Sequence, residues 1–313
     1  MQNQSTLEDP LTTFVAMGSP CEIRIEGLAP QERALISADL IAEIERLEAK
    51  YSRYRETSLL SGINRAAAVG GRVEVDDETA GLLDYAEACH VQSDGLFDIT
   101  SGILREAWPF SQRTQLRLPP SRAQLAPLLA RVGWEKLRWQ RPVLAFGATG
   151  MALDFGGIVK EYAADCAAAL ATAQGVRHGL INLGGDIRII GNRADGDPWR
   201  IGIRDPGSSD ALMATVALSS GGLTTSGDYA RCFMIDGVRY GHLLNPRTGW
   251  PVRALSAVTV TADLCVIAGS ASTIAMLKED AGPAWLEALG LPHLWVAADG
   301  QRGGTLPGAR AEK

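Results

Sequence analysis

The chain has 313 residues, of which 46% are hydrophobic and 21% are charged, and its formal net charge is −6. This hydrophobic fraction supports a large buried core and excludes a disordered composition. A mildly acidic chain without a basic stripe does not suit a nucleic-acid-binding protein. We therefore expect a folded protein with no nucleic-acid partner.

The N-terminal residues lack the basic and apolar regions of a signal peptide. No run of about eighteen apolar residues predicts a transmembrane segment. The five cysteines are odd in number and form no Cys-x-x-Cys pair, which favours buried, reduced thiols over disulfides or a zinc site. These features predict a cytoplasmic protein, with a periplasmic location as the alternative if a leader is omitted from this chain.

The first elements in chain order are a strand and two helices. Residues 14–26 read as a strand that Gly18 and Pro20 interrupt. Apolar residues recur at helical spacing over residues 31–51 and again over residues 77–93. The second helix ends at a Ser-Asp-Gly sequence that is typical of a turn.

The middle of the chain begins with a candidate linker at residues 109–120. A short helix follows, and the capping box from Ser121 to Gln124 opens it. Residues 136–154 are predicted to form a hairpin, and residues 158–173 form a helix that a nearby glycine closes. We expect one domain over residues 1–313, with a division into two lobes near residues 109–121 as an option.

The C-terminal half is predicted to consist mostly of strands, with one further helix at residues 266–278. Alternating apolar residues indicate the strands, and Asp236-Gly237 is typical of a hairpin turn. The strands lie at residues 180–183, 187–189, 201–203, 234–240, 255–261 and 294–298. Helices and strands mix without a regular βαβ rhythm, so we expect an α+β fold with mixed, mainly antiparallel sheets and packed helices.

Glycine clusters occur at four predicted junctions between elements, and glycine there lets the backbone approach a ligand. Taken singly, each cluster is more often an ordinary turn, but together they favour a phosphorylated ligand. Gly156-Gly157 precedes a helix whose free N–H groups suit a phosphate, and Lys160 adds a positive charge. The spacing matches neither the Rossmann nor the P-loop motif. The clusters span residues 154–160, 182–186, 221–228 and 245–249.

From about Met17 to Leu291 the sequence resembles the FAD:protein FMN transferase family, also called the ApbE family. The order and spacing of several motifs carry this resemblance. They are Met17-Gly-Ser, residues 51–64, the Gly-x-Phe-Asp-x-Thr-x-Gly sequence at residues 95–102, residues 153–160 with Asp165, and residues 182–186, 225–229 and 242–249.

The resemblance implies an FAD site between two lobes and Mg²⁺-dependent cleavage of the FAD pyrophosphate. FMN would be joined to a threonine or serine hydroxyl of an acceptor flavoprotein, and AMP would leave. Two alternatives stay open. One is an FAD-binding protein that acts as a carrier or electron-transfer partner without efficient transfer. The other is an FAD pyrophosphatase that releases FMN and AMP.

The resemblance also implies roles for individual residues. His242 is the candidate base because imidazole titrates near neutral pH, Arg247 would pair with phosphate oxygens, and Asp228 would orient a donor or bind the metal. A structural histidine, a solvated arginine and a turn-capping aspartate are the competing interpretations. The predicted cofactor-binding residues are Met17, Tyr51, Phe97, Asp98, Asp154, Gly156, Gly157, Lys160, Gly184, Gly185, Asp186, Thr225, Ser226, Gly227 and Tyr229. Asp154 and Asp186 are expected to hold loop backbone rather than to do chemistry.

One departure concerns the metal site. Family members commonly carry an aspartate four residues before a threonine on the last long helix, where both would lie on one face and bind Mg²⁺. Here Thr273 is kept, but Gly269 stands at the aspartate position. Three hypotheses follow. Thr273, a backbone carbonyl near Val159, water and the pyrophosphate hold the metal; Asp228 or Asp263 supplies the carboxylate; or FAD binds without efficient transfer.

A second departure is Glu161, which stands where the family usually has glycine. It adds an acidic side chain to the first turn of the helix that follows Gly156-Gly157. The resemblance assigns it no role.

Overall fold

The computed structural model describes residues 10–110, 118–208, 211–228 and 231–306. Its centre is an eight-stranded sheet in the order β1-β2-β6-β7-β10-β13-β14-β15, in which every neighbouring pair is antiparallel. The predicted α+β class is therefore confirmed. The strands are β1 (Leu11–Ala16), β2 (Ser19–Ile25), β6 (Gly179–Leu183), β7 (Asp186–Ile190), β10 (Gly221–Gly227), β13 (Leu255–Ala262), β14 (His293–Ala297) and β15 (Arg302–Gly304).

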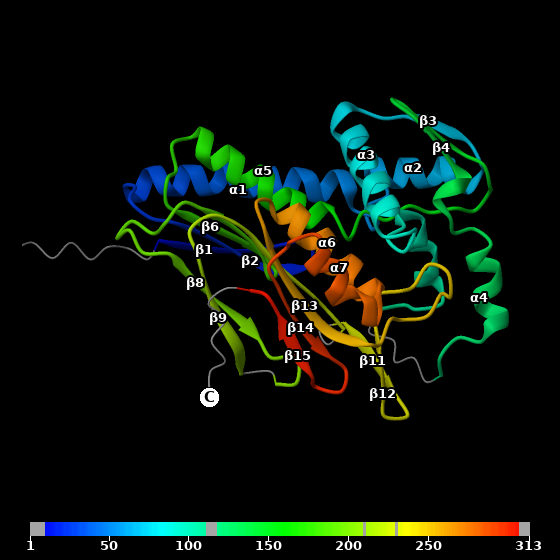
Figure 1. Cartoon of the computed structure of the whole chain (residues 1–313). Helices are drawn as coiled ribbons and strands as arrows, with labels where there is room; N and C mark the ends of the chain where they lie inside the picture. The colour runs from blue at the N-terminus through cyan, green and yellow to red at the C-terminus, as the bar shows by residue number, and fades with distance from the viewer. Residues whose placement is uncertain (1–9, 111–117, 209–210, 229–230, 307–313) are drawn as a thin grey trace, which may run out of the picture.

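Helices cover one face of this sheet (Figure 1). They are α1 (Pro30–Tyr51), α5 (Val159–Ala173), α6 (Cys265–Leu277) and α7 (Gly282–Ala288), with the short 3-10 helix η3 (Glu279–Ala281) between the last two. The buried side of α5 is built mostly from alanines, and α6 is buried along nearly its whole length. The main hydrophobic core lies between these helices and the sheet.

The hairpin of β8 (Trp199–Arg204) and β9 (Leu212–Leu218) contributes to a second core on the sheet. Trp199, Ile201 and Ile203 alternate with exposed residues along β8, as the sequence pattern predicts for a strand with one buried face. They form one cluster with Ile189 of β7 and Leu223 of β10. The sheet thus has apolar contacts beyond those that the helices make.

A smaller lobe lies beside the sheet, on the right in Figure 1. Its three-stranded sheet has the order β3-β5-β4, so β3, which precedes residues 109–121, pairs with β5, which follows them. Both sides of that segment therefore contribute to one small sheet. The elements are α2 (Leu59–Ala68), β3 (Arg72–Glu74), α3 (Asp77–Gln92), η1 (Ile99–Glu106), α4 (Arg122–Leu129), η2 (Trp134–Lys136), β4 (Leu137–Gln140) and β5 (Val143–Phe146). A separate hairpin of β11 (Cys232–Ile235) and β12 (Val238–Gly241) precedes β13.

Two predicted elements differ from the structure. Residues 14–26 form a hairpin rather than one interrupted strand, because Met17 and Gly18 turn the chain with φ values of 52° and 69°. Residues 221–227 form the interior strand β10 rather than a loop, since they pair with β7 and β13. The predicted helices at residues 31–51, 77–93, 158–173 and 266–278 are confirmed to within one residue at either end. Much of the predicted linker lies outside the described residues.

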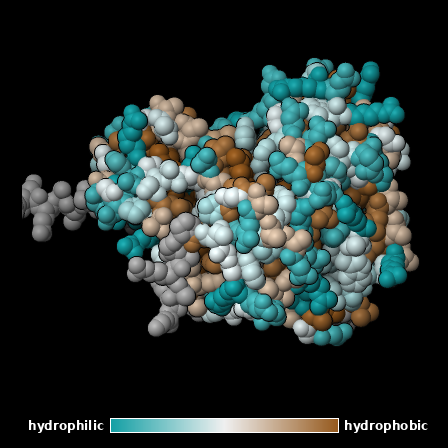
Figure 2. Space-filling model, viewed as in Figure 1, coloured by the Kyte–Doolittle hydropathy of each residue, from teal (hydrophilic) through white to brown (hydrophobic). Residues whose placement is uncertain are grey.

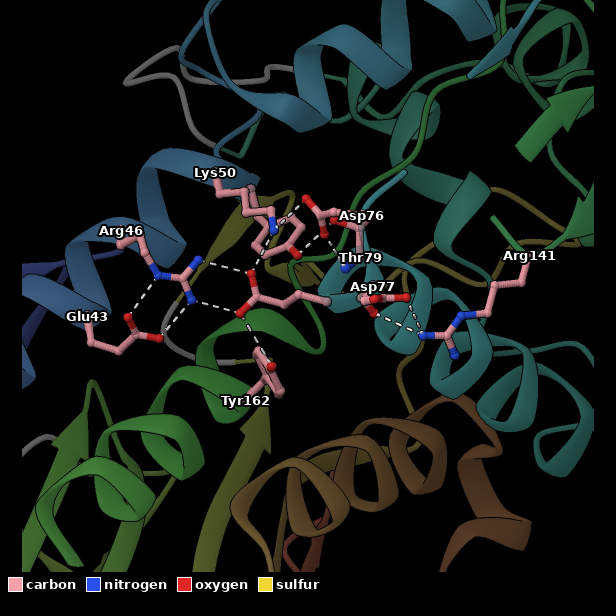
Figure 3. Close-up of polar contacts among 10 residues, drawn as sticks. Glu43, Arg46, Lys50, Asp76, Asp77, Thr79, Arg141 and Tyr162 are labelled. Carbon is pink, nitrogen blue, oxygen red and sulfur yellow. Dashed lines mark hydrogen bonds and ion pairs between the residues drawn. The ribbon is translucent and has the colours of Figure 1, made fainter. Parts of the chain in front are cut away.

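Ion pairs from Arg46 and Lys50 of α1 to Glu78 join α1 to α3; Figure 3 labels Arg46, Lys50 and several of their neighbours. The Glu78 carboxylate lies 2.7 Å from Arg46 Nη2 and 2.7 Å from Lys50 Nζ. Tyr162 of α5 donates a hydrogen bond of 3.5 Å to the same carboxylate. The hydrogen bonds from Arg46 are the main cause that holds the pKa of Glu78 at about 2, well below its usual range.

The described part of the chain contains no helix that combines the length and the apolar character needed to cross a membrane. Large hydrophobic side chains that are exposed, such as Val15, Leu35, Val69 and Val91, come from different elements. On the face shown in Figure 2, hydrophobic residues are interspersed with hydrophilic ones. Single exposed apolar residues of this kind are normal on a folded protein.

Candidate active site at the N-terminal end of helix α5

The glycine-containing turn between β6 and β7 lies close to Lys160, in the first turn of α5. A Cβ atom placed on Gly184 would lie 2.6 Å from Cβ of Ser19 and 3.8 Å from Nζ of Lys160. Gly184 and Gly185 have φ values of 63° and 101°, which favour glycine. The β6–β7 turn therefore approaches the β1–β2 hairpin, which carries Met17. The structure thus places Gly184 next to Ser19 and Lys160, and the roles of Met17, Lys160, Gly184 and Gly185 toward a cofactor stay predictions.

Lys160 and Asp186 form an ion pair with an Nζ–Oδ2 distance of 2.7 Å. Asp186 is buried, and burial raises the pKa of its carboxyl group while Lys160 opposes this shift. For Lys160, burial lowers the pKa, but Asp186 and Glu161 raise it more, and the net shift is upward. Lys160 is thus a charged group held at the start of α5, where helix N–H groups also favour an anion.

Asp154 organises a second part of the site. Its Oδ2 lies 3.1 Å from Arg105 Nε and 3.3 Å from Arg53 Nη1. Its Oδ1 accepts a hydrogen bond of 2.8 Å from the backbone N–H of Gly156. The side chain thus holds the glycine loop before α5, as the sequence led us to expect, and also positions two guanidinium groups there.

His242 lies within electrostatic reach of Arg105, Arg231 and Lys160. Burial, followed by the charges of Arg231 and Arg105, lowers the pKa of His242 to about 4. Its Nδ1 is buried and has no hydrogen-bond partner among the described residues. At neutral pH the imidazole is therefore uncharged, and this nitrogen can accept a proton.

Three of these cations were not among the predicted site residues. Arg53, Arg105 and Arg231 interact with one another or with Lys160 through their charges. The only sequence signal was the position of Arg53 inside the motif at residues 51–64. A concentration of positive charge in a partly buried setting raises the local concentration of a multiply charged anion such as a pyrophosphate.

A group of hydroxyl side chains faces α6. Ser226 Oγ lies 3.0 Å from Thr273 Oγ1 and 2.8 Å from Ser272 Oγ. Because side chains alternate along a strand, the neighbouring Thr225 points the other way and contacts Thr259 Oγ1 at 2.8 Å. Of the predicted segment 225–227, Ser226 is thus the residue that joins Thr273.

Glu161 of α5 is buried against Gly269 of α6. A Cβ atom on Gly269 would lie 2.5 Å from Cγ and 2.8 Å from Oε1 of Glu161, so the glutamate uses the space that the glycine leaves. Its Oε2 is buried without a hydrogen-bond partner in the described part of the chain. Burial, with a further contribution from Asp186, raises the pKa of Glu161 to about 8.

These residues fit a magnesium ion that relies on few protein ligands. Glu161 has an unsatisfied buried carboxylate oxygen, and Thr273 on the adjacent helix has a hydroxyl group. The described residues contain no group of three or more His, Cys, Asp or Glu side chains that could hold a metal. Mg²⁺ commonly binds through one or two carboxylates together with substrate phosphates, so such a group is not required.

Several predicted cofactor-binding residues make structural contacts. Tyr51 is buried, its hydroxyl lies 3.0 Å from Thr79 Oγ1, and its ring meets Phe155 edge-on at a centroid distance of 5.8 Å. Phe97 is buried against Gly157, with 3.4 Å between its ring and a Cβ placed there.

Asp98 is also engaged by the protein. Its oxygens accept hydrogen bonds from the backbone N–H groups of Thr100 and Trp134, at 2.8 Å and 3.0 Å. These contacts cap η1 and attach it to the start of η2. Asp98 thus shapes the loop, and its predicted direct role toward a cofactor stays a prediction.

The other candidate polar residues also have partners or lie elsewhere. Asp228 is buried and pairs with Arg239 at 3.2 Å, and burial raises the pKa of its carboxyl group. The Arg247 guanidinium donates to the backbone carbonyl of Asp94. Asp263 is exposed in the turn between β13 and α6. Tyr229, predicted to bind the cofactor, lies outside the described residues.

The surface also carries two open hollows. One, of about 710 Å³, is lined by α5, β7 and the turn before α6, and includes Asp165 and Arg188. The other, of about 520 Å³, is lined by residues of the smaller lobe, such as Asp98, and by Pro246 and Arg247. Neither is lined by Lys160, His242 or Thr273. We place the site by its charges and unsatisfied polar atoms, because these indicate chemistry better than the volume of a hollow.

Comparison with known proteins shows which family the sequence matches. The sequence profile of the ApbE family matches residues 17–295. The FAD:protein FMN transferase of Vibrio cholerae is 31% identical over 278 residues, which covers 88% of this chain and 82% of that protein. The FAD:protein FMN transferase of Rhodobacter capsulatus is 32% identical, but the match covers 85% of this chain and only 50% of that protein, so the chain spans half of its length.

Solved structures give the same result. The crystal structure of the ApbE protein of Thermotoga maritima superposes with a TM-score of 0.84 at 31% identity and covers 94% of this chain and 96% of that one. The flavin transferase ApbE of Vibrio cholerae superposes with a TM-score of 0.84 at 27% identity, covering 95% and 97%. With the profile spanning most of the sequence and the fold shared throughout, this chain belongs to the ApbE family.

Proposed function

We propose that this protein transfers the FMN half of FAD to a threonine or serine hydroxyl of an acceptor flavoprotein and releases AMP. The proteins that it resembles carry the name FAD:protein FMN transferase. The observation that carries the proposal is the convergence of Lys160, Arg105 and Arg231 on His242, which is uncharged at neutral pH. A site of this kind suits the attack of a hydroxyl group on a pyrophosphate.

The cations supply the charge neutralisation that phosphoryl transfer needs. Lys160, together with the N–H groups at the start of α5, would bind phosphate oxygens from one side. Arg105 is positioned by Asp154, since its Nε lies 3.1 Å from Asp154 Oδ2. It would bind the phosphate oxygens from the side of the loop before α5. These groups are held before the ligand arrives, which limits the entropy that binding costs.

His242 would accept the proton of the attacking hydroxyl at Nδ1. Because its pKa is lowered to about 4, the imidazole is available as a base over the whole neutral range. The proton that it gains is disfavoured by the surrounding arginines, so the phosphate charge must be present to balance it. The base is therefore most effective when the substrate is bound.

We further propose that Mg²⁺ takes part. Thr273, the backbone carbonyl of Val159 and a carboxylate at the α5–α6 contact are the groups that would hold it. When bound, Mg²⁺ neutralises charge on phosphate oxygens. The unsatisfied Oε2 of Glu161 supports this assignment.

Mass spectrometry of an acceptor flavoprotein incubated with FAD, Mg²⁺ and the protein tests the function. A gain of one FMN mass on a threonine or serine, with release of AMP, is expected. His242→Gln should abolish the gain, whereas His178→Gln should not, since His178 contacts the backbone carbonyl of Asn192 away from Lys160. AMP release without an adduct would replace the proposal with FAD hydrolysis. FAD binding with neither product would replace it with a carrier role.

A further inference from the structure

We propose that Glu161 supplies the carboxylate oxygen for a divalent cation at the pyrophosphate, from the space that Gly269 leaves open. This inference rests on the proposed function. It names the protein carboxylate that would hold the divalent cation of that reaction. It also explains two departures from the family's sequence pattern, Gly269 on α6 and Glu161 on α5.

The first observation is the close fit between the two residues. A side chain on Gly269 would begin 2.5 Å from Glu161 Cγ and 2.8 Å from Oε1, which is closer than non-bonded atoms approach. Gly269 thus lets the glutamate reach the face of α6. The carboxylate comes from α5 but lies where a short acidic side chain on α6 would lie.

The second observation is an unsatisfied carboxylate oxygen on Glu161. Oε2 is buried and lacks a hydrogen-bond partner among the described residues. An unpaired buried carboxylate oxygen is costly unless a cation or donor satisfies it. This oxygen is therefore the available acceptor at the contact between the two helices.

Among the neighbouring carboxylates, Asp186 Oδ2 also lacks a hydrogen-bond partner in the described residues, but an ion pair with a lysine satisfies it. Asp186 lies 2.7 Å from Lys160 Nζ. Asp165, one turn after Glu161 on α5, accepts hydrogen bonds of 2.9 Å from the N–H groups of Cys265 and Val266 and pairs with Arg188 at 2.9 Å. Both are already engaged, which leaves Glu161 as the carboxylate for an added ion.

The third observation is that the two helices that carry Glu161 and Gly269 also offer neutral oxygen donors. Thr273 lies one turn after Gly269 on the same face of α6, and Ser226 Oγ lies 3.0 Å from its hydroxyl oxygen. Val159 is the first residue of α5, two positions before Glu161. Carboxylate, hydroxyl and carbonyl oxygens are the ligand types that Mg²⁺ prefers, and substrate phosphates complete its shell.

Titration of Mn²⁺, followed by the loss of the electron paramagnetic resonance signal of the free ion, tests this inference on the FAD-loaded protein. Loss of even an outer-shell partner typically weakens metal binding by about 10–100-fold, so loss of the direct carboxylate ligand in Glu161→Gln should weaken Mn²⁺ binding by at least about 10-fold. The exchanged variant Glu161→Gly/Gly269→Asp should recover most of the affinity. Asp165→Asn, the matched control on the same helix, should bind Mn²⁺ like the wild type.

The inference is overturned if Glu161→Gln, shown to be folded by circular dichroism, binds Mn²⁺ as tightly as the wild type. Failure of the folded exchanged variant to regain affinity would equally overturn it. Should that variant not fold, Glu161→Asp replaces it, and its shorter side chain should still weaken binding. FMN transfer is measured separately at saturating Mn²⁺. Glu161-dependent binding without transfer would contradict the proposed function alone, and transfer with Glu161-independent binding would contradict this inference alone.

Discussion

Lys160 Nζ lies 2.7 Å from Oδ2 of the buried Asp186, and this ion pair joins the first turn of α5 to the first residue of β7. A long, flexible lysine is thereby held in one place beside the Gly184-Gly185 turn. A phosphate that enters there meets a cation whose position is already fixed. Under the proposed function, this ion pair should affect both the stability of the sheet and the affinity for FAD.

Replacing Lys160 by methionine should affect both properties. The buried Asp186 carboxylate would lose its partner, and breaking a buried pair in this way destabilises proteins by about 3–5 kcal/mol. Urea denaturation measures this loss, and quenching of FAD fluorescence should show weaker FAD binding. Lys278→Met is the control, since Lys278 pairs with the exposed Asp94 at 2.6 Å. Equal losses in the two variants would contradict the assigned role of Lys160.

Gly269→Ala should destabilise the protein because its Cβ would meet the Glu161 side chain. Overpacking of this kind costs about 1–3 kcal/mol. Adding Glu161→Ala should relieve most of the cost, so the double-mutant cycle should show strong coupling. Gly62→Ala, in α2, serves as the control: its Cβ would meet only Arg65 Nη2 at 3.6 Å, so it should not destabilise. Additive effects at Glu161 and Gly269 would argue against the contact.

Stability should fall as the pH decreases from about 6.5 to about 4, because His242 is protonated more readily in the unfolded state. Its folded pKa is about 4, and an unperturbed imidazole titrates near 6.5. The unfolded state therefore binds more protons between these values, which removes at most ~3 kcal/mol of stability as the pH falls. Chemical denaturation across this range should show a flatter profile for His242→Gln than for the wild type. If His242→Gln and the wild type had the same pH profile of stability, His242 would lie in a more polar environment than the structure indicates.

The Glu78 network should stabilise the protein above about pH 4.5 and lose its effect at lower pH. The folded pKa of Glu78 is about 2, against an ordinary value of 4.5, so its stabilising charge disappears as the pH falls through this interval. Glu78→Gln should lower the melting temperature at pH 7, and the difference from the wild type should shrink at pH 3. Asp77→Asn, which alters an exposed pair with Arg141, is the control. A difference that does not depend on pH would refute the electrostatic explanation.

Much of the fold could be predicted from local sequence patterns. The helices at residues 31–51, 77–93 and 158–173 have apolar faces that periodicity detects, and the Asp236-Gly237 hairpin has its usual turn residues. Strand β10 was not predicted, because Gly221-Gly222 and three consecutive hydroxyl residues are typical of a loop. Its neighbours β7 and β13 decide that it lies inside the sheet, and single-sequence patterns do not contain such pairing.

The site was predictable only in part, for a related reason. The order of the motifs predicted Lys160, Asp154 and His242 as site residues. In the structure, Arg105 pairs with Asp154, and the charges of Arg105 and Lys160 act on His242. Arg105 and Arg231 could not be found, since an isolated arginine carries no periodic signal. The fit of Glu161 against Gly269 depends on how two helices pack, although the pair of departures was visible in the sequence.

The hairpin of β1 and β2 forms one edge of the sheet, and Ser19 at the start of β2 lies beside the Gly184 turn that approaches Lys160. Shortening the chain from its N-terminus into β1 would therefore do more than expose the edge of β2. It would also disturb the contact between this hairpin and the Gly184 turn near Lys160. Truncated forms that lose FAD affinity should be interpreted as altered binding sites and not only as weakened folds.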